Sequence, residues 1–313
     1  MSGGPRIIAA PDVYKLIRPK DLLPVIEKAL GNYSMGRDGG VIQPVRTVVP
    51  IEKYHGFLGV MSAFSGRDEA LAVKLVSFYP EAKDHPTHQA WVMIFNPATG
   101  NLTAIVDGES ITAIRTGIAS AVASKHLANP NASVLAILGS GIQARSHFEA
   151  LSLLHSFAEV RIWSRTLANA QKLATEIGAK ACSTAEEAVR DADIICTVTF
   201  ATTPIIQADW VKPGAHINAV GACRADWQEL SSQLMKTSVV YCDSRDACNQ
   251  EAGDVIQSGC DIYAEIGEVI NGHKEAFWEK TTVFKSVGIA IEDVVSAKMV
   301  LDRYVNCPTM TNG

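Results

Sequence analysis

The sequence predicts an α/β protein with two domains, and three observations support this class. The 313 residues exceed the length at which one hydrophobic core usually stops growing. After residue 133, short apolar runs alternate with helical segments, which is typical of a doubly wound parallel sheet covered on both faces. Between residues 41 and 106, strand-like runs are joined by hairpin-length turns. We therefore expect a parallel-sheet domain and an α+β domain with a mainly antiparallel sheet.

The composition predicts a globular protein with a small-molecule partner. The chain is 47% hydrophobic and 19% charged, and its formal net charge of −5 disfavours nucleic acid or an anionic membrane as partner. The segment Met1–Ile26 lacks the pattern of a secretory leader, and no apolar run is long enough to span a bilayer. Seven cysteines without CxxC spacing indicate reduced thiols, so we expect a cytoplasmic protein. His85 and His88 flank a proline in a loop-like stretch, and no metal site is expected.

The first domain is expected to begin with a helix over residues 11–35, divided at Pro11, Pro19 and Pro24. A final amphipathic helix, Ile289–Tyr304, is expected to return to this domain. Apolar alternation between Gly, Pro, Asn and Asp predicts its strands at Val41–Val49, Gly56–Phe64, Leu71–Tyr79, Ala90–Phe95 and Leu102–Val106.

A helix rich in small residues, Ser110–Leu127, is expected to bridge the two domains. We place the first domain at residues 1–117 plus 285–313 and the second at 118–284. Buried apolar runs predict the strands of the second domain at Val134–Leu138, Val160–Trp163, Ile194–Thr199, His216–Val220 and Val239–Cys242.

The turn Gly139–Ala144 (GSGIQA) follows the apolar strand Val134–Leu138 and opens an expected helix, Gln143–Leu154. In this arrangement, backbone N–H groups and a helix N-terminus bind a pyrophosphate. Gly139 would permit the tight turn, and Gly141 would allow a phosphate to approach the backbone closely. The alternative is a packing turn without a ligand, which the strand-turn-helix context disfavours. The pattern predicts a Rossmann-type dinucleotide site.

The segment Ser164, Arg165 and Thr166 predicts which dinucleotide binds. Enzymes that use NAD carry an acidic residue about 20 residues beyond the glycine turn, where it binds the ribose 2′-hydroxyl. Here a guanidinium and two hydroxyls take that place, and they suit a 2′-phosphate. Arg165 as an ordinary solvated residue is the alternative, and the missing acid also disfavours a methyltransferase. We therefore predict NADPH as the cofactor.

Two cations interrupt apolar strands of the first domain. Strand alternation places Lys74 on one face with Val76, and Arg46 on one face with Val48. A buried cation needs an anion or water, so either these faces are exposed or the anion is a substrate carboxylate. Arg115 and Thr116, on the bridging helix, would add donors where the domains meet, although a surface arginine is the alternative.

The chain resembles the ornithine cyclodeaminase and mu-crystallin family nearly from end to end, and most closely its ketimine-reducing members. The resemblance is carried by Gln43–Thr47, Lys74–Val76, His88–Ala90, Asp107–Gly108, Arg115–Thr116, Ile162–Thr166, Gly214–Ala222, Gly253–Val255 and Thr281–Ser286.

This resemblance implies an anion-binding substrate pocket of Arg46, Lys74 and Glu251, with Arg46 and Lys74 as catalytic residues. It also implies a homodimer formed through the sheet of the first domain, and a pocket that binds iodothyronines as well. The NADPH site is expected to comprise His88, Gln89, Arg115, Thr116, Gly139, Gly141, Ile142, Gln143, Ser164, Arg165, Thr166, Thr199, Val220 and Ser286.

One position separates the activities within the family. Cyclodeaminases carry a catalytic Asp directly after a segment similar to Val220–Ala222, whereas this chain has Cys223. A thiol is a poor substitute for that carboxylate as a proton acceptor. We therefore expect NADPH-dependent reduction of cyclic ketimine carboxylates, of the piperideine- or pyrroline-2-carboxylate type, to L-imino acids. Ornithine deamination, a non-enzymatic hormone carrier and a lens crystallin remain alternatives.

Overall fold

The computed structural model describes residues 4–307. Residues 1–3 and 308–313 lie outside the described residues. They include the two ends of the expected first domain and the start of the segment Met1–Ile26. The described chain divides into two compact units, one of residues 4–115 with 289–307 and the other of residues 116–288. The division falls within the helix α3, Gly108–Leu127, which runs from one unit into the other.

The first unit is built on a sheet which, within the described residues, has seven strands in the order β1-β7-β6-β5-β4-β2, with β3 also paired to β4. Every pairing is antiparallel except that of β1 with β7. This confirms the mainly antiparallel α+β class. Its elements are β1 (Arg6–Ile8), α1 (Ala10–Leu16), α2 (Pro19–Ser34), β2 (Val41–Ile42), β3 (Thr47–Ile51), β4 (Gly56–Ser65), β5 (Ala70–Phe78), β6 (His88–Phe95), β7 (Leu102–Asp107) and α11 (Ala290–Val305), with short 3-10 turns at Gly36–Gly39 and Glu52–Tyr54.

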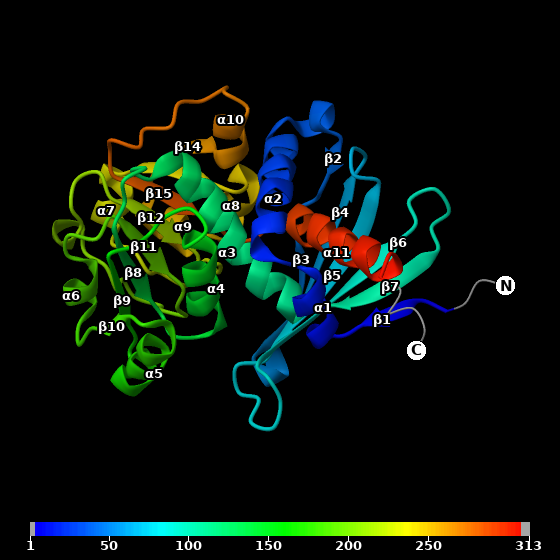
Figure 1. The fold of residues 1–313 in the computed structure, drawn as a ribbon, viewed down its shortest axis with the longest axis horizontal. Coiled ribbons are helices and arrows are strands. Elements are labelled where there is room, and N and C mark those ends of the chain that lie inside the picture. Colours follow the sequence, from blue (N-terminus) through cyan, green and yellow to red (C-terminus); the bar gives the residue numbers. More distant parts are fainter. Residues whose placement is uncertain (1–3, 308–313) are drawn as a thin grey trace. The chain divides into compact units, whose positions relative to one another are not determined.

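The two faces of this sheet have different surroundings. Alternate residues of β5, including Lys74, Val76 and Phe78, are buried on the face against which α11 packs, as expected from strand alternation. Helix α11 crosses β4 and β5 and also packs beside α2 (Figure 1). On the opposite face, large apolar side chains such as Trp91 and Leu58 are 43% and 37% exposed.

Two expectations for the first unit were wrong in detail. Pro24 lies inside α2 and does not divide it, whereas Pro19 begins that helix. The expected strand Val41–Val49 is broken between β2 and β3, because Pro44 has no N–H to give to a ladder. Arg46 is therefore a loop residue directly before β3, and its expected placement by strand alternation does not hold.

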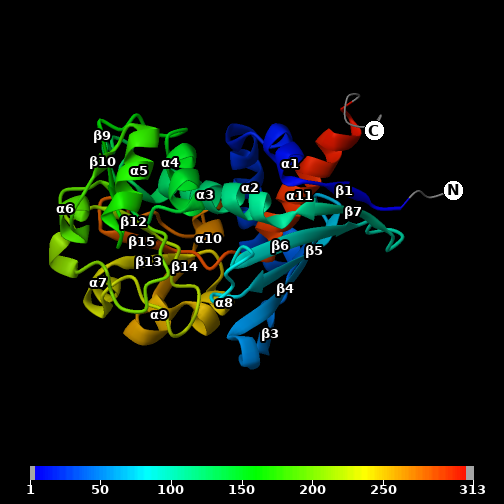
Figure 2. The ribbon, with the colours of Figure 1, turned by 90° about the horizontal axis from the view of Figure 1, so that it is seen from below.

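The second unit is a doubly wound parallel sheet, which confirms the predicted class. Within the described residues, its eight strands have the order β10-β9-β8-β11-β12-β15-β13-β14, and each pairing is parallel. Helix α5 lies on one face of the sheet and α7 and α9 on the other (Figure 2). Besides the second part of α3, the elements are β8 (Val134–Leu138), α4 (Ile142–Leu151), β9 (Glu159–Trp163), α5 (Leu167–Ile177), β10 (Lys180–Ala181), α6 (Ala185–Val189), β11 (Ile194–Thr197), a 3-10 turn (Ala208–Trp210), β12 (His216–Ala219), α7 (Ser232–Thr237), β13 (Val239–Cys242), α8 (Arg245–Glu251), α9 (Gly253–Ser258), β14 (Ile262–Glu265), α10 (Ile266–Ile270) and β15 (Thr282–Lys285).

The sequence patterns did not predict β1, β10, β14 or β15, each of which has two to four residues. Strand β15 is the most consequential, because it lies between β12 and β13 and all four of its residues are buried. Its last residue, Lys285, therefore reaches the same edge of the sheet as the carboxyl ends of β11 and β12. In the part of the chain that the structure describes, no helix is long and apolar enough to cross a membrane.

Candidate active site

Four charged side chains form a buried cluster in the first unit, which we call the cation cluster. Lys74 Nζ lies 2.7 Å from Asp293 Oδ2, and Arg115 binds Asp293 Oδ1 at 3.0 Å and Glu292 Oε2 at 2.7 Å. All four side chains are at most 4% exposed. Lys74 Nζ also donates to Thr112 Oγ1 at 3.4 Å. The cluster therefore pairs two cations with two anions away from bulk water.

Three elements bring these side chains together. Lys74 comes from β5, Arg115 from α3, and both carboxylates come from the first turn of α11, where the helix dipole favours negative charge. Gln43, in the loop that ends at Arg46, accepts a hydrogen bond from the N–H of Ile291 at 2.7 Å. That bond ties the loop to the start of α11 and satisfies a donor that the helix itself cannot pair.

Burial lowers the pKa of Lys74 to about 8, although the carboxylate of Asp293 acts in the opposite direction. Burial likewise opposes ionisation of Asp293, but Arg115 and Lys74 together hold the pKa of Asp293 below its usual value. For Arg115, the two carboxylates outweigh burial and raise its pKa. The pKa of Lys74 therefore lies close enough to neutrality for its charge to change between about pH 7 and pH 9.

His88 and Arg46 lie within electrostatic reach of Lys74. Burial and the charges of Lys74 and Arg115 together lower the pKa of His88 to about 4, so the imidazole is neutral at pH 7. Arg46 is half-buried, and its positive charge lowers the pKa of Lys74. Arg46 therefore adds a third positive charge near the two carboxylates of the cluster. Gln89, next to His88, is exposed.

The glycine turn of the second unit fits a pyrophosphate. Gly139 has φ 133°, in the region that favours glycine, and a Cβ there would lie 2.7 Å from the side chain of Val198. A Cβ on Gly141, in contrast, would have no heavy atom within 4 Å. Gly141 is the N-cap of α4, and among the described residues no side chain caps this helix end. Exposed backbone at an uncapped helix start, with open space in front of it, is what an anion requires.

The segment that follows β9 is linked to the glycine turn. Ser140 Oγ donates to Ser164 Oγ at 3.0 Å, which links the glycine turn to the segment after β9. Arg165 and Thr166 are both exposed, and Arg165 has no hydrogen bond or ion pair with any described residue. A guanidinium in this position is available for a phosphate. Ile142 is 65% exposed and Gln143 is half-buried, both in the first turn of α4.

The other expected residues of the second unit lie near carboxyl ends of strands or helices. Thr199 and Val220 follow β11 and β12 and are half-buried, and Ser286 follows β15 and donates to Asp243 Oδ2 at 3.1 Å. Thr116 is buried within α3, and Glu251 ends α8. The structure thus gathers Thr199, Val220 and Ser286 at the carboxyl edge of the sheet, as expected for a doubly wound fold.

Sequence reasoning missed both anions of the cation cluster. Glu292 and Asp293 lie 177 and 178 residues after Arg115, so no local spacing connects them. The available indication was two adjacent acids within a helix that is otherwise apolar at its start. It also missed a second buried charged group, formed by Glu229, Asp254 and Lys285 in the second unit. Among residues 4–307, no three or more His, Cys, Asp or Glu side chains are grouped so as to hold a metal ion.

A parallel sheet with a glycine turn between β8 and α4 defines the second unit as a Rossmann-type dinucleotide-binding fold. Comparison with known proteins identifies the family more closely. The model of the ornithine cyclodeaminase/mu-crystallin family matches residues 5–307, so the chain belongs to this family. This confirms the resemblance seen in the sequence.

Relatives over the full length include reductases of C=N bonds. The chain is 53% identical to ketimine reductase mu-crystallin from Rattus norvegicus over 97% of this chain and 99% of that protein. It is 35% identical to a Δ1-pyrroline-2-carboxylate reductase from Bacillus cereus, with 96% of each chain covered. Among solved structures, the Thermococcus litoralis Δ1-pyrroline-2-carboxylate reductase in complex with NADH and L-proline aligns with a TM-score of 0.91 and 33% identity, covering 96% of this chain and 98% of the other.

Proposed function

We propose that this protein is an NADPH-dependent reductase of cyclic ketimine carboxylates of the piperideine- or pyrroline-2-carboxylate type, which it converts to L-imino acids. The observation that carries the proposal is the cation cluster, in which the buried Lys74 pairs with Asp293 and has a pKa of about 8, and beside which Arg46 adds a further positive charge. The names of the relatives that act on C=N bonds support the same chemistry.

Lys74 of the cation cluster and the nearby Arg46 each have a part in this reaction. Arg46 binds the substrate carboxylate, because a guanidinium suits a carboxylate in geometry and charge. Lys74 uses two of its three N–H donors for Asp293 and Thr112, and no third acceptor exists among the described residues. The third N–H serves the imine nitrogen and keeps it protonated, which makes the adjacent carbon electrophilic. NADPH supplies the hydride that this carbon accepts.

The second unit supplies the cofactor site. Gly141 and the first turn of α4 bind the pyrophosphate, and Ser164, Arg165 and Thr166 bind the 2′-phosphate. The free guanidinium of Arg165 supports NADPH over NADH, because an enzyme selective for NADH would carry a carboxylate in this segment.

The direct test mixes the purified protein with a cyclic imine carboxylate and either NADPH or NADH, and follows nicotinamide absorbance between pH 5 and pH 8. We expect oxidation of NADPH with stoichiometric formation of the L-imino acid, and a kcat/KM at least ~tenfold lower with NADH, since Arg165 contributes a charged hydrogen bond only to the phosphorylated cofactor. Absence of turnover with both cofactors would refute the proposal.

Arg46→Ala should chiefly raise KM for the imine, by roughly 10- to 100-fold, because a charge-assisted contact to the carboxylate contributes about 1.5–3 kcal/mol. The affinity for NADPH serves as the internal control and should stay unchanged. An unchanged KM would remove Arg46 from the substrate site.

The same site supports iodothyronine binding, since these hormones also carry a carboxylate that Arg46 can bind. Competition between a hormone and the imine in the assay would indicate a shared site, whereas hormone binding without imine turnover would favour a carrier. Deamination of ornithine finds no support at Cys223, which is half-buried and gives no carboxylate at that position. Ammonia release from ornithine without net cofactor oxidation would restore that alternative.

We also propose that two copies pair through the outer face of the first-unit sheet. Register places Trp91 opposite Leu75, and Leu75 opposite Val60, so these apolar side chains share one face. Ile7, on the edge strand β1, extends this face and is 68% exposed. A contiguous exposed apolar face of this kind is typical of an interface. An archaeal alanine dehydrogenase with a TM-score of 0.90 and 31% identity to this chain is described as a dimer.

A further inference from the structure

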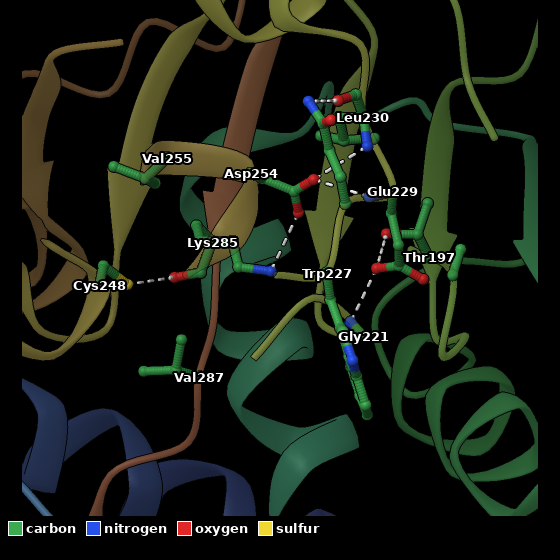
Figure 3. Close-up of polar contacts among 12 residues, drawn as sticks. Thr197, Gly221, Trp227, Glu229, Leu230, Cys248, Asp254, Val255, Lys285 and Val287 are labelled. Atoms are coloured by element: carbon green, nitrogen blue, oxygen red, sulfur yellow. Dashed lines mark hydrogen bonds and ion pairs between the residues drawn. The ribbon is translucent and has the colours of Figure 1, made fainter. Parts of the chain in front are cut away.

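Three loops at the carboxyl edge of the second-unit sheet are joined by a buried charged network that the proposed reaction does not use. Its members are Glu229, Asp254 and Lys285, each fully buried (Figure 3). Glu229 binds the loops after β11 and β12, and Lys285 ends β15. We call these three residues the loop network.

Glu229 accepts four hydrogen bonds, which fill both of its oxygens. Oε1 accepts from the N–H and the hydroxyl of Thr199, each at 2.7 Å. Oε2 accepts from Thr197 Oγ1 at 2.7 Å and from the N–H of Gly221 at 2.8 Å. Two of the four donors are backbone groups, so the carboxylate fixes the path of both loops. Although burial and the nearby Asp254 raise the pKa of Glu229, this set of donors requires an acceptor at each oxygen.

The two loops approach each other so closely that only glycine fits at one position. A Cβ on Gly221 would lie 2.0 Å from the carbonyl oxygen of Thr199 and 2.5 Å from Glu229 Oε1. The backbone at Gly221 therefore packs directly against the loop that carries Thr199.

Asp254 and Lys285 extend the network to the third loop. Asp254 Oδ1 accepts from the backbone N–H groups of Glu229 and Leu230, at 2.8 and 3.0 Å, and so holds the chain that carries Glu229. Asp254 Oδ2 accepts from Lys285 Nζ at 3.1 Å, with both side chains fully buried (Figure 3). Lys285 directly precedes Ser286, so the chain after β15 is tied to the same carboxylates.

The position of the network relative to the glycine turn indicates what it serves. A dinucleotide lies across the carboxyl edge of a doubly wound sheet, with its pyrophosphate at the glycine turn and its two halves on opposite sides of that turn. The segment that suits the 2′-phosphate follows β9, on one side of β8. The strands β11, β12 and β15 lie on the other side, where the nicotinamide half belongs.

We propose that Glu229, supported by Asp254 and Lys285, is a positioning residue that holds the loops after β11, β12 and β15 in place for the nicotinamide half of the cofactor. This inference rests on the proposed function, because it presupposes NADPH. Glu229 acts through Thr199 and Gly221, and its own carboxylate is closed off by the four donors.

A matched control exists at the opposite edge of the same sheet. Asp193 accepts from the backbone N–H groups of Ser133 and Val134, both at 2.8 Å, and pairs with Lys212 at 2.5 Å. It therefore resembles the loop network in its partners, but it lies at the amino end of β8 and β11. Asp193→Asn should lower thermal stability, but it should not weaken binding of the nicotinamide half of the cofactor more than binding of the adenosine half.

The decisive variant is Glu229→Gln, which keeps the shape of the side chain. In either orientation, its amide nitrogen faces a backbone N–H, of Thr199 or of Gly221, from which it cannot accept. Binding of NADPH and of adenosine 2′,5′-bisphosphate, which lacks the nicotinamide half, would be measured by calorimetry for the wild type, Glu229→Gln and Asp193→Asn. We expect about tenfold weaker NADPH binding by Glu229→Gln, with bisphosphate affinity changed by less than about twofold, and no such difference for Asp193→Asn.

Thr197→Val provides a milder second variant should Glu229→Gln fail to fold. It removes one donor to Glu229 from a fully buried strand residue and keeps the backbone contacts. We expect it to weaken NADPH binding by about threefold and to leave bisphosphate binding unchanged. If a variant loses affinity equally for NADPH and for the bisphosphate, or loses no affinity for NADPH, the inference is overturned. The proposed function stays intact in that case as long as the wild type binds NADPH. A wild type that does not bind NADPH would overturn both.

Discussion

The pKa of Lys74 is low enough for this side chain to exchange a proton near neutral pH. Full burial favours the neutral amine, whereas Asp293 at 2.7 Å favours the ammonium, and the balance lowers its pKa to about 8. Asp293 also binds Arg115, so one carboxylate serves two cations. The charge of Asp293 therefore controls the protonation of Lys74 more directly than any other group in the cluster does.

The pH profile tests this control. If protonated Lys74 is the active form, kcat/KM should be highest below pH 8 and fall as the pH rises through about 8. Asp293→Asn removes the charge that raises the pKa of Lys74, so the alkaline limb should move to lower pH. Asp302→Asn is the control, because it removes a carboxylate from the exposed part of the same helix. A limb that stays in place in Asp293→Asn would contradict the assignment.

The residues of the candidate active site differ in how far the sequence predicted them. Lys74 was visible as a cation in an apolar strand, where strand alternation placed it on one face with Val76, and the structure shows that this face is buried. Its anion was not, because Asp293 reaches it only through the return of α11 to the first unit. Arg46 was assigned to a strand in which Pro44 cannot pair, and it lies in a loop. Local pattern thus identified the buried charge, and tertiary contact supplied its partner.

At the scale of elements, the turn between β8 and α4 has two glycines with different requirements. Gly139 needs its backbone conformation and has no room for a Cβ, whereas Gly141 has an ordinary φ of −87° and open space in front of it. We therefore expect the first glycine to serve the fold of the turn and the second to serve the binding of the cofactor.

Alanine at each position should separate these two roles. Gly139→Ala should lower the melting temperature, since the strained φ costs about 1 kcal/mol or more and the Cβ meets Val198. Gly141→Ala should leave the melting temperature within about 2 °C of the wild type, since surface changes without strain alter stability little. It should nevertheless weaken NADPH binding by at least ~tenfold, because the methyl group occupies the phosphate position. Equal effects of the two variants on melting and binding would contradict this division.

Elements were predictable where their periodicity was long or their boundaries were marked. The apolar run of β8 and the glycine turn predicted a strand at Val134–Leu138 and a helix start at Gln143, and the structure has the same strand and a helix that starts one residue earlier, at Ile142. Strand β15 escaped prediction because four residues that end in a lysine resemble a loop as much as a strand. The strand lies between β12 and β13, which buries Lys285, and the ion pair with Asp254 compensates for the burial of its charge.

At the scale of the whole molecule, the proposed dimer interface on the exposed face of the first-unit sheet can be tested by mutation. Trp91→Glu places a charge at the centre of the proposed interface and should convert the dimer to a monomer in sedimentation velocity experiments. Tyr14→Glu, at a 54% exposed position on α1 of the same unit, should leave the assembly unchanged. A dimer that persists in Trp91→Glu would remove this face as the interface.

The return of α11 also determines when the cation cluster can exist during synthesis. The second unit is one continuous stretch, so it can complete its fold as soon as residue 288 leaves the ribosome. Lys74 and Arg115 are made long before Glu292 and Asp293, and until then both cations lack their buried anions. Breaking such a buried pair costs about 3–5 kcal/mol. A nascent or truncated chain that ends before α11 therefore contains the whole second unit but lacks both carboxylates that pair with Lys74 and Arg115 in the first unit.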